Sequence, residues 1–189
     1  MSDDTSQQLT RITVDTNLLI SGFIRTGTPP RQLLQVWIRG AVRLVTSADI
    51  RAEIAEVLHR PTFARYRFDA QLMAAVLEAL AVSEPVEPLP ASDLPFHGRD
   101  RSDDLFLACA LAAHRDYLVT GDNALHELAG QPALGAIRIV TVRELLARIG
   151  SGPDARQPRC IVVQVYSPTI ATLLRRREYH PRGRVCRQP

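Results

Sequence analysis

Apolar positions along the chain follow two spacings in turn, one typical of strands and one typical of helices. Short runs rich in β-branched residues predict buried strands, at residues 11–15, 41–46, 116–120 and 136–141. Between these runs, apolar residues recur every three or four positions, which predicts helices at residues 30–40, 48–59, 69–82, 104–113, 122–128 and 142–149. Pro29 or Pro30 suits the start of the first helix, and Ser47 and Ser102 are candidate caps for the second and fourth. Several prolines mark residues 84–98 as a loop, with at most a short strand at its start.

Strands that alternate with helices indicate an α/β protein, in which helices cover both faces of a parallel sheet. All the predicted elements lie within residues 9–150, so we expect this segment to form one domain. Gly150, Gly152 and Pro153 then interrupt the pattern. We expect residues 151–189 to be a basic tail, either disordered or loosely docked on the domain.

The formal net charge of +3 is unevenly distributed. Residues 151–189 contain eight Arg against two acids, a net of +6, which leaves −3 for residues 1–150. All 23 basic residues are Arg, so any phosphate contacts would be made by guanidinium groups. The slightly acidic body is not the pattern of a domain that binds nucleic acid by charge alone.

Neither a secretory signal nor an apolar run long enough to cross a membrane is present in the sequence, and we therefore expect a cytoplasmic protein. The three cysteines are Cys109, Cys160 and Cys186, and their spacing fits neither a disulfide framework nor a CxxC metal site. Cys109 lies in an apolar run and is interpreted as a small buried side chain.

Four acidic residues, far apart in the sequence, fall where a parallel sheet would bring them together. Asp15 ends the first predicted strand and Asp122 follows the strand at residues 116–120, so both belong at the carboxyl edge of the sheet. Helices between parallel strands begin at that same edge. Glu53, in the second turn of one helix, and Asp104, at the start of another, are therefore placed there as well.

Clustered carboxylates repel one another, and a hard divalent cation such as Mg²⁺ or Mn²⁺ relieves that repulsion. Such a site can hold a phosphodiester and activate water to attack it. Each acid also has a simpler interpretation: Asp15 and Asp122 as caps, Asp104 as a first-turn acid favoured by the helix dipole, Glu53 as helix surface. Four acids at one edge favour the metal site.

Four stretches around these acids resemble PIN domains, in particular bacterial PIN proteins described as putative toxins. They are V-D-T-N at residues 14–17, E-x-x-E-V-L-x-R-P at residues 53–61, D-D-x-F-L-A at residues 103–108 and Y-L-V-T-G-D at residues 117–122. The resemblance covers about residues 11–149. It departs at Asn123 and Ala124, where related sequences often carry a further acid, so one bound metal or two remain open.

The resemblance implies a Rossmann-like PIN fold and a Mg²⁺- or Mn²⁺-dependent endoribonuclease, the toxin of a VapC-like toxin–antitoxin pair. It implies RNA as substrate and a cognate antitoxin as partner, and PIN relatives suggest a homodimer. The residues that match the family's catalytic and metal-binding acids are Asp15, Glu53, Asp104 and Asp122. Asn17 and Thr120 match supporting positions, and Asp103 adjoins the matched Asp104 and is an alternative to it.

Three other interpretations differ in class. A catalytically silent PIN scaffold that binds RNA or protein would be favoured by the loss of an acid, and none of the four is lost. An RNA-processing nuclease without an antitoxin would share the site but not the partner. A nucleotide-binding Rossmann protein would carry GxGxxG or GxxxxGK[ST] after the first strand, and neither spacing occurs there.

Overall fold

A computed structural model of the chain describes residues 9–60, 70–98, 100–113 and 116–150. A five-stranded parallel sheet with the order β3-β2-β1-β4-β5 forms its centre. The strands are β1 (Thr10–Val14), β2 (Val42–Thr46), β3 (Glu84–Pro85), β4 (Tyr117–Val119) and β5 (Arg138–Val140). The α/β class and the parallel sheet predicted from the alternating pattern are confirmed.

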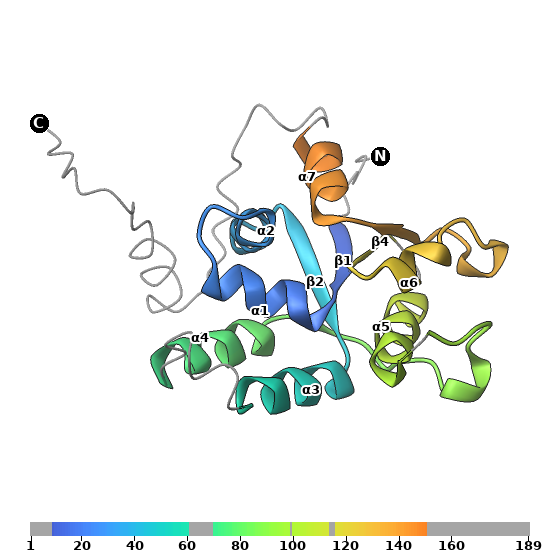
Figure 1. Cartoon of the computed structure of the whole chain (residues 1–189), viewed down its shortest axis with the longest axis horizontal. Coiled ribbons are helices and arrows are strands. Elements are labelled where there is room, and N and C mark those ends of the chain that lie inside the picture. The colour runs from blue at the N-terminus through green and yellow to red at the C-terminus, as the bar shows by residue number, and fades with distance from the viewer. Residues whose placement is uncertain (1–8, 61–69, 99, 114–115, 151–189) are drawn as a thin grey trace, which may run out of the picture.

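Helices connect the strands and cover the sheet on both sides (Figure 1). They are α1 (Thr16–Ile24), α2 (Pro29–Ile38), α3 (Ala48–Leu58), α4 (Ala70–Ala81), α5 (Arg101–Ala112), α6 (Asn123–Glu127) and α7 (Val142–Gly150), with short 3-10 turns η2 (Ala91–Asp93) and η3 (Pro132–Leu134). Helix α2 contacts β2, α1 and α7, whereas α5 contacts β1, β2 and β4. In Figure 1, α2 and α5 lie on opposite sides of β1 and β2.

The helix starts follow local chemistry, with one correction. Pro29 begins α2, and the Ser47 hydroxyl caps α3 by accepting a hydrogen bond from the Ile50 N–H at 3.2 Å, as predicted. The predicted cap at Ser102 is wrong, because α5 begins at Arg101 with Asp100 as its N-cap. The Asp100 N–H donates to the carboxylate of Asp103, so an acid inside the first turn stabilises this end of the helix.

Helix α1 was not predicted from the pattern, because its nine residues (TNLLISGFI) are too few to show a clear helical spacing of apolar positions. In the structure Leu19, Ile20 and Phe23 are buried, and α1 contacts α2, α3 and α4 as well as lying next to the sheet. Only Asn17 of this helix is exposed, so neighbouring elements enclose most of α1 and its sequence carries little of the polar stripe that marks a surface helix.

The registers place the carboxyl ends of the central strands side by side. Thr13 pairs with Leu118 and Val14 with Val119, and the Asp15 N–H continues the ladder by donating to the Val119 carbonyl at 3.0 Å. The residues that follow β1 and β4 therefore meet at one edge. No helix within the described ranges is long and apolar enough to span a membrane. The predicted tail, residues 151–189, lies outside these ranges.

Candidate metal centre

Asp15 occupies the turn between β1 and α1, and its carboxylate is held on both oxygens. Oδ1 accepts the Asn17 backbone N–H at 2.7 Å, which caps α1, and Oδ2 accepts the Thr120 hydroxyl at 3.1 Å. Only 8% of the residue is exposed. Burial raises the pKa of Asp15 above its ordinary value, against the lowering effect of these hydrogen bonds, and the nearby charge of Asp122 raises the pKa further.

Thr120 connects Asp15 to Asp122. Its buried hydroxyl donates to Asp15 and accepts the Asp122 backbone N–H at 3.0 Å. Asp122 itself is exposed, and its Oδ1 caps α6 by accepting the Ala124 N–H at 2.7 Å. One hydroxyl thus joins two segments that are more than a hundred residues apart.

Glu53 approaches the same edge from α3. The Thr16 hydroxyl, adjacent to Asp15, donates to its Oε2 at 3.2 Å. Partial burial raises the pKa of Glu53, the Thr16 hydrogen bond opposes that shift, and the neighbouring charge of Asp15 adds to it. The structure therefore brings Asp15, Glu53 and Asp122 into one electrostatic group, as the topology argument predicted for these three acids.

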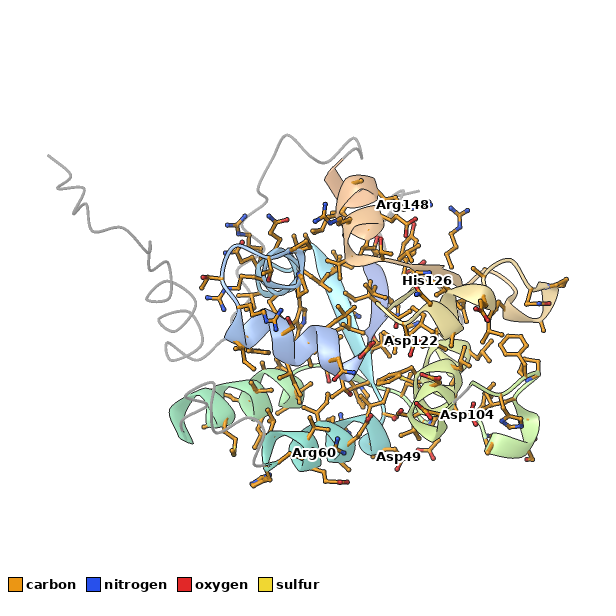
Figure 2. The ribbon with its side chains drawn as sticks, in the orientation of Figure 1. Asp49, Arg60, Asp104, Asp122, His126 and Arg148 are labelled. Atoms are coloured by element: carbon orange, nitrogen blue, oxygen red, sulfur yellow. The ribbon has the colours of Figure 1, made fainter. Side chains whose placement is uncertain are left out.

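Asp104 is placed at the beginning of α5, as expected, but a different segment holds its carboxylate. Oδ1 accepts the Gly98 N–H at 2.7 Å, and Oδ2 lies 2.9 Å from Nδ1 of His97. Both donors come from the loop before α5. Figure 2 shows Asp104 on α5 and Asp122 at the start of α6, on the same side of the molecule.

Asp103 differs from its neighbour in its surroundings. It is 6% exposed, and its carboxylate is used by the Asp100 N–H inside the first turn of α5. The Asp104 side chain is 23% exposed. The structure therefore offers Asp104, and not Asp103, as the carboxylate of this pair that solvent or a ligand can reach.

Sequence reasoning missed three contacts of these acids. Thr16 donates a hydrogen bond to Glu53, and both Gly98 and His97 contact Asp104. Only Thr16 had a signal, since it directly follows Asp15 in the V-D-T-N stretch. Asn17 donates its backbone N–H to Asp15, and Asn17 itself is exposed to solvent.

The chemistry of the donors fits a hard divalent cation. The four acids provide oxygen ligands, and Asp15 carries a poorly solvated negative charge next to Asp122 and Glu53, which a cation would stabilise. Within the described part of the chain, no three Asp, Glu, His or Cys side chains converge closely enough to enclose an ion by themselves.

Cys109, the cysteine in the described part of the chain, does not suit the role of a nucleophile at this site. Cys109 is fully buried in α5, where burial raises the pKa of its thiol to about 11, and the Thr13 hydroxyl donates to its sulfur at 3.9 Å. A neutral, enclosed thiol is inert. The predicted role of Cys109 as a small buried side chain agrees with this environment.

Comparison with known protein families identifies a match. A family model described as PIN domain matches residues 11–124, more than half of the chain, and the matched segment contains Asp15, Glu53, Asp104 and Asp122. No curated protein and no solved structure matched the chain. PIN domains are a nuclease family whose members generally use divalent metal ions. The sheet order and the family match agree, and the chain belongs to the PIN domain family.

Proposed function

We propose that this protein is a Mg²⁺- or Mn²⁺-dependent endoribonuclease that hydrolyses phosphodiester bonds of RNA. The observation that supports this most is the buried carboxylate of Asp15, placed beside Asp122 and Glu53 at the carboxyl edge of the sheet. Family membership supports nuclease chemistry, and RNA as the substrate comes from the sequence resemblance.

In this proposal the chain's own residues hold and orient the cation. Asp15 is its main ligand, because hydrogen bonds from Asn17 and Thr120 already fix the carboxylate. Asp122, Glu53 and Asp104 complete the site directly or through water. The bound cation supplies positive charge that stabilises the transition state of phosphodiester hydrolysis and makes water more acidic.

Substituting each acid by its amide tests this assignment. Asp15→Asn, Asp104→Asn and Asp122→Asn should each reduce RNA cleavage by at least about a hundredfold, since loss of even an outer contact of a metal site commonly costs 10–100-fold. Glu53→Gln should cost the same or less, because this side chain reaches the edge from a helix. Cleavage of mixed RNA with Mg²⁺, Mn²⁺ or EDTA gives the measurement.

Two exposed acids away from the group serve as matched controls. Glu56→Gln, on α3, removes an exposed ion pair with Arg60 and a weak repulsion of Glu53, and Asp93→Asn lies in η2. Both should cleave like the wild type. Wild-type rates in all of the Asp15, Asp104 and Asp122 variants would disprove the site, and a wild type inactive with both metals would favour the silent scaffold.

We further propose that the nuclease is the toxin of a toxin–antitoxin pair, with a small cognate protein as its inhibitor. This rests on the resemblance of residues 53–61 and 103–108 to bacterial PIN proteins of that kind. Expression of the chain alone should slow bacterial growth, expression of Asp15→Asn should not, and co-expression of an adjacent small gene should restore growth. Normal growth with soluble, active nuclease would favour the RNA-processing alternative.

A further inference from the structure

The loop before α5 supplies both hydrogen-bond donors that reach the Asp104 carboxylate. His97 Nδ1 lies 2.9 Å from Oδ2, and the Gly98 N–H donates to Oδ1 at 2.7 Å. We propose that His97 is a positioning residue of the metal centre, which together with Gly98 fixes the orientation of Asp104 toward a divalent cation. The inference rests on the proposed function, since it concerns the same site.

The loop is anchored tightly enough to impose an orientation. Leu94 is buried, Phe96 packs against the core, and the Leu89 N–H donates to the Ala108 carbonyl of α5 at 3.3 Å. At Gly98 the backbone comes so close to α5 that an added Cβ would lie 2.1 Å from the Cβ of Asp103. The backbone of Gly98 is therefore packed against the first turn of α5. This contact also fixes the position of the preceding residue, His97.

The two contacts are of the strong type and still leave room for a cation. Hydrogen bonds to an ionised carboxylate at these lengths are charge-assisted. Each carboxylate oxygen has a second lone pair, so one donor on each oxygen leaves an acceptor site free on both. The two donors fix the rotation of the carboxylate before a metal binds. Metal binding therefore does not have to restrict that rotation.

The geometry also identifies the atom of His97 that acts. Nδ1 faces Asp104, and it must carry a proton to donate to an ionised carboxylate. The His97 side chain is 61% exposed, against 23% for Asp104. If Nδ1 is the functional atom, asparagine should take over the role of His97, because its side-chain N–H occupies nearly the place of Nδ1. Glutamine, which mimics Nε2, should not.

Isothermal titration of the full-length protein with Mn²⁺ tests this. His97→Ala and His97→Gln should each raise the Kd for Mn²⁺ by about tenfold, the lower end of what loss of an outer contact costs, and His97→Asn should remain near the wild type. His59→Ala is the matched control, since His59 is exposed and, among the described residues, its Nδ1 contacts the Ala55 carbonyl of the helix that it ends, at 2.6 Å. Thermal unfolding in EDTA verifies that each variant folds, and a purely structural role would change only that measurement.

The outcomes separate this inference from the proposed function. If the wild type binds Mn²⁺, Asp15→Asn does not, and His97→Ala binds as the wild type does, the role of His97 is disproved while the metal centre stands. Tighter binding by His97→Ala would mean that the loop holds Asp104 away from the cation, which also overturns the inference. If His97→Asn and His97→Gln both kept the wild-type affinity for Mn²⁺, Nδ1 would be excluded as the acting atom. A wild type that binds no Mn²⁺ refutes both proposals.

Discussion

The carboxylate of Asp15 accepts two hydrogen bonds, caps a helix and is nevertheless poorly solvated. Asp122 also caps its helix, and Asp104 is a first-turn acid. The simpler interpretations of these residues are therefore correct as descriptions of local geometry, and they do not compete with a metal site. A cap fixes the backbone and one oxygen of a carboxylate, and the remaining lone pairs stay available for a ligand.

At the residue scale, we predict that the metal-free protein becomes less stable as the pH rises from about 4 to 7, the range just above the ordinary pKa values of Asp and Glu. The pKa values of Asp15 and Glu53 are both raised, mainly by burial. In that range the native state keeps protons that the unfolded chain has released, so the free energy of unfolding falls with pH until it passes the raised pKa values. Mg²⁺ at neutral pH should recover the loss by binding only the native state.

Urea unfolding in EDTA across this pH range, with and without Mg²⁺, measures the effect. The double variant Asp15→Asn, Glu53→Gln should show a flatter pH profile and no stabilisation by Mg²⁺, because both titrating groups are removed. Glu56→Gln, an exposed change on the same helix as Glu53, should behave as the wild type. An identical pH profile in the wild type and the double variant would contradict the assignment of these two buried charges.

At the scale of elements, the packing of α1 against α2 depends on a glycine. A Cβ at Gly22 would lie 2.7 Å from the Pro30 carbonyl oxygen and 2.9 Å from the Leu34 side chain. We predict that Gly22→Ala destabilises the protein by about 1–3 kcal/mol, the usual cost of overpacking. This reverses the gain of about 0.5–1 kcal/mol that alanine normally brings to a helix interior.

Gly150 is the matched control for this substitution. It also lies in a helix, α7, and a Cβ there would meet nothing within 4 Å. Gly150→Ala should therefore leave the urea midpoint unchanged or raise it slightly. If Gly22→Ala were as stable as the wild type, the close contact between α1 and α2 would not exist in solution.

At the scale of the molecule, the strand order decides which residues meet. Because β1 lies between β2 and β4, Asp15 is next to the residues that follow both neighbours. The opposite edge is closed differently: Arg11 donates to the Ala113 carbonyl at 2.7 Å and pairs with Glu84, and its backbone N–H donates to Asp116 at 2.7 Å. Charge at that edge is balanced by neighbouring protein groups. At the carboxyl edge acids adjoin acids, which favours a cation from solution.

The sequence alone was sufficient for the parallel α/β fold and for placing Asp15, Glu53 and Asp122 near one another. Runs of β-branched residues predict strands, and periodic apolar positions together with caps such as Ser47 predict helices. These signals are local. Once a parallel sheet is inferred, its topology alone predicts that Asp15 and Asp122 share an edge. The structure agrees with both predictions.

Only the tertiary structure decided which partner each acid has. The burial of Asp15, the hydroxyl of Thr120 between two acids, the difference between Asp103 and Asp104, and the contact of His97 with Asp104 all depend on groups that packing brings together. Helix α1 escaped prediction for the same reason, since its surroundings and not its own periodicity make it a buried helix. Hydrophobic spacing records which face of an element is buried, but the distances between side chains of different elements are set by close packing, which no local pattern encodes.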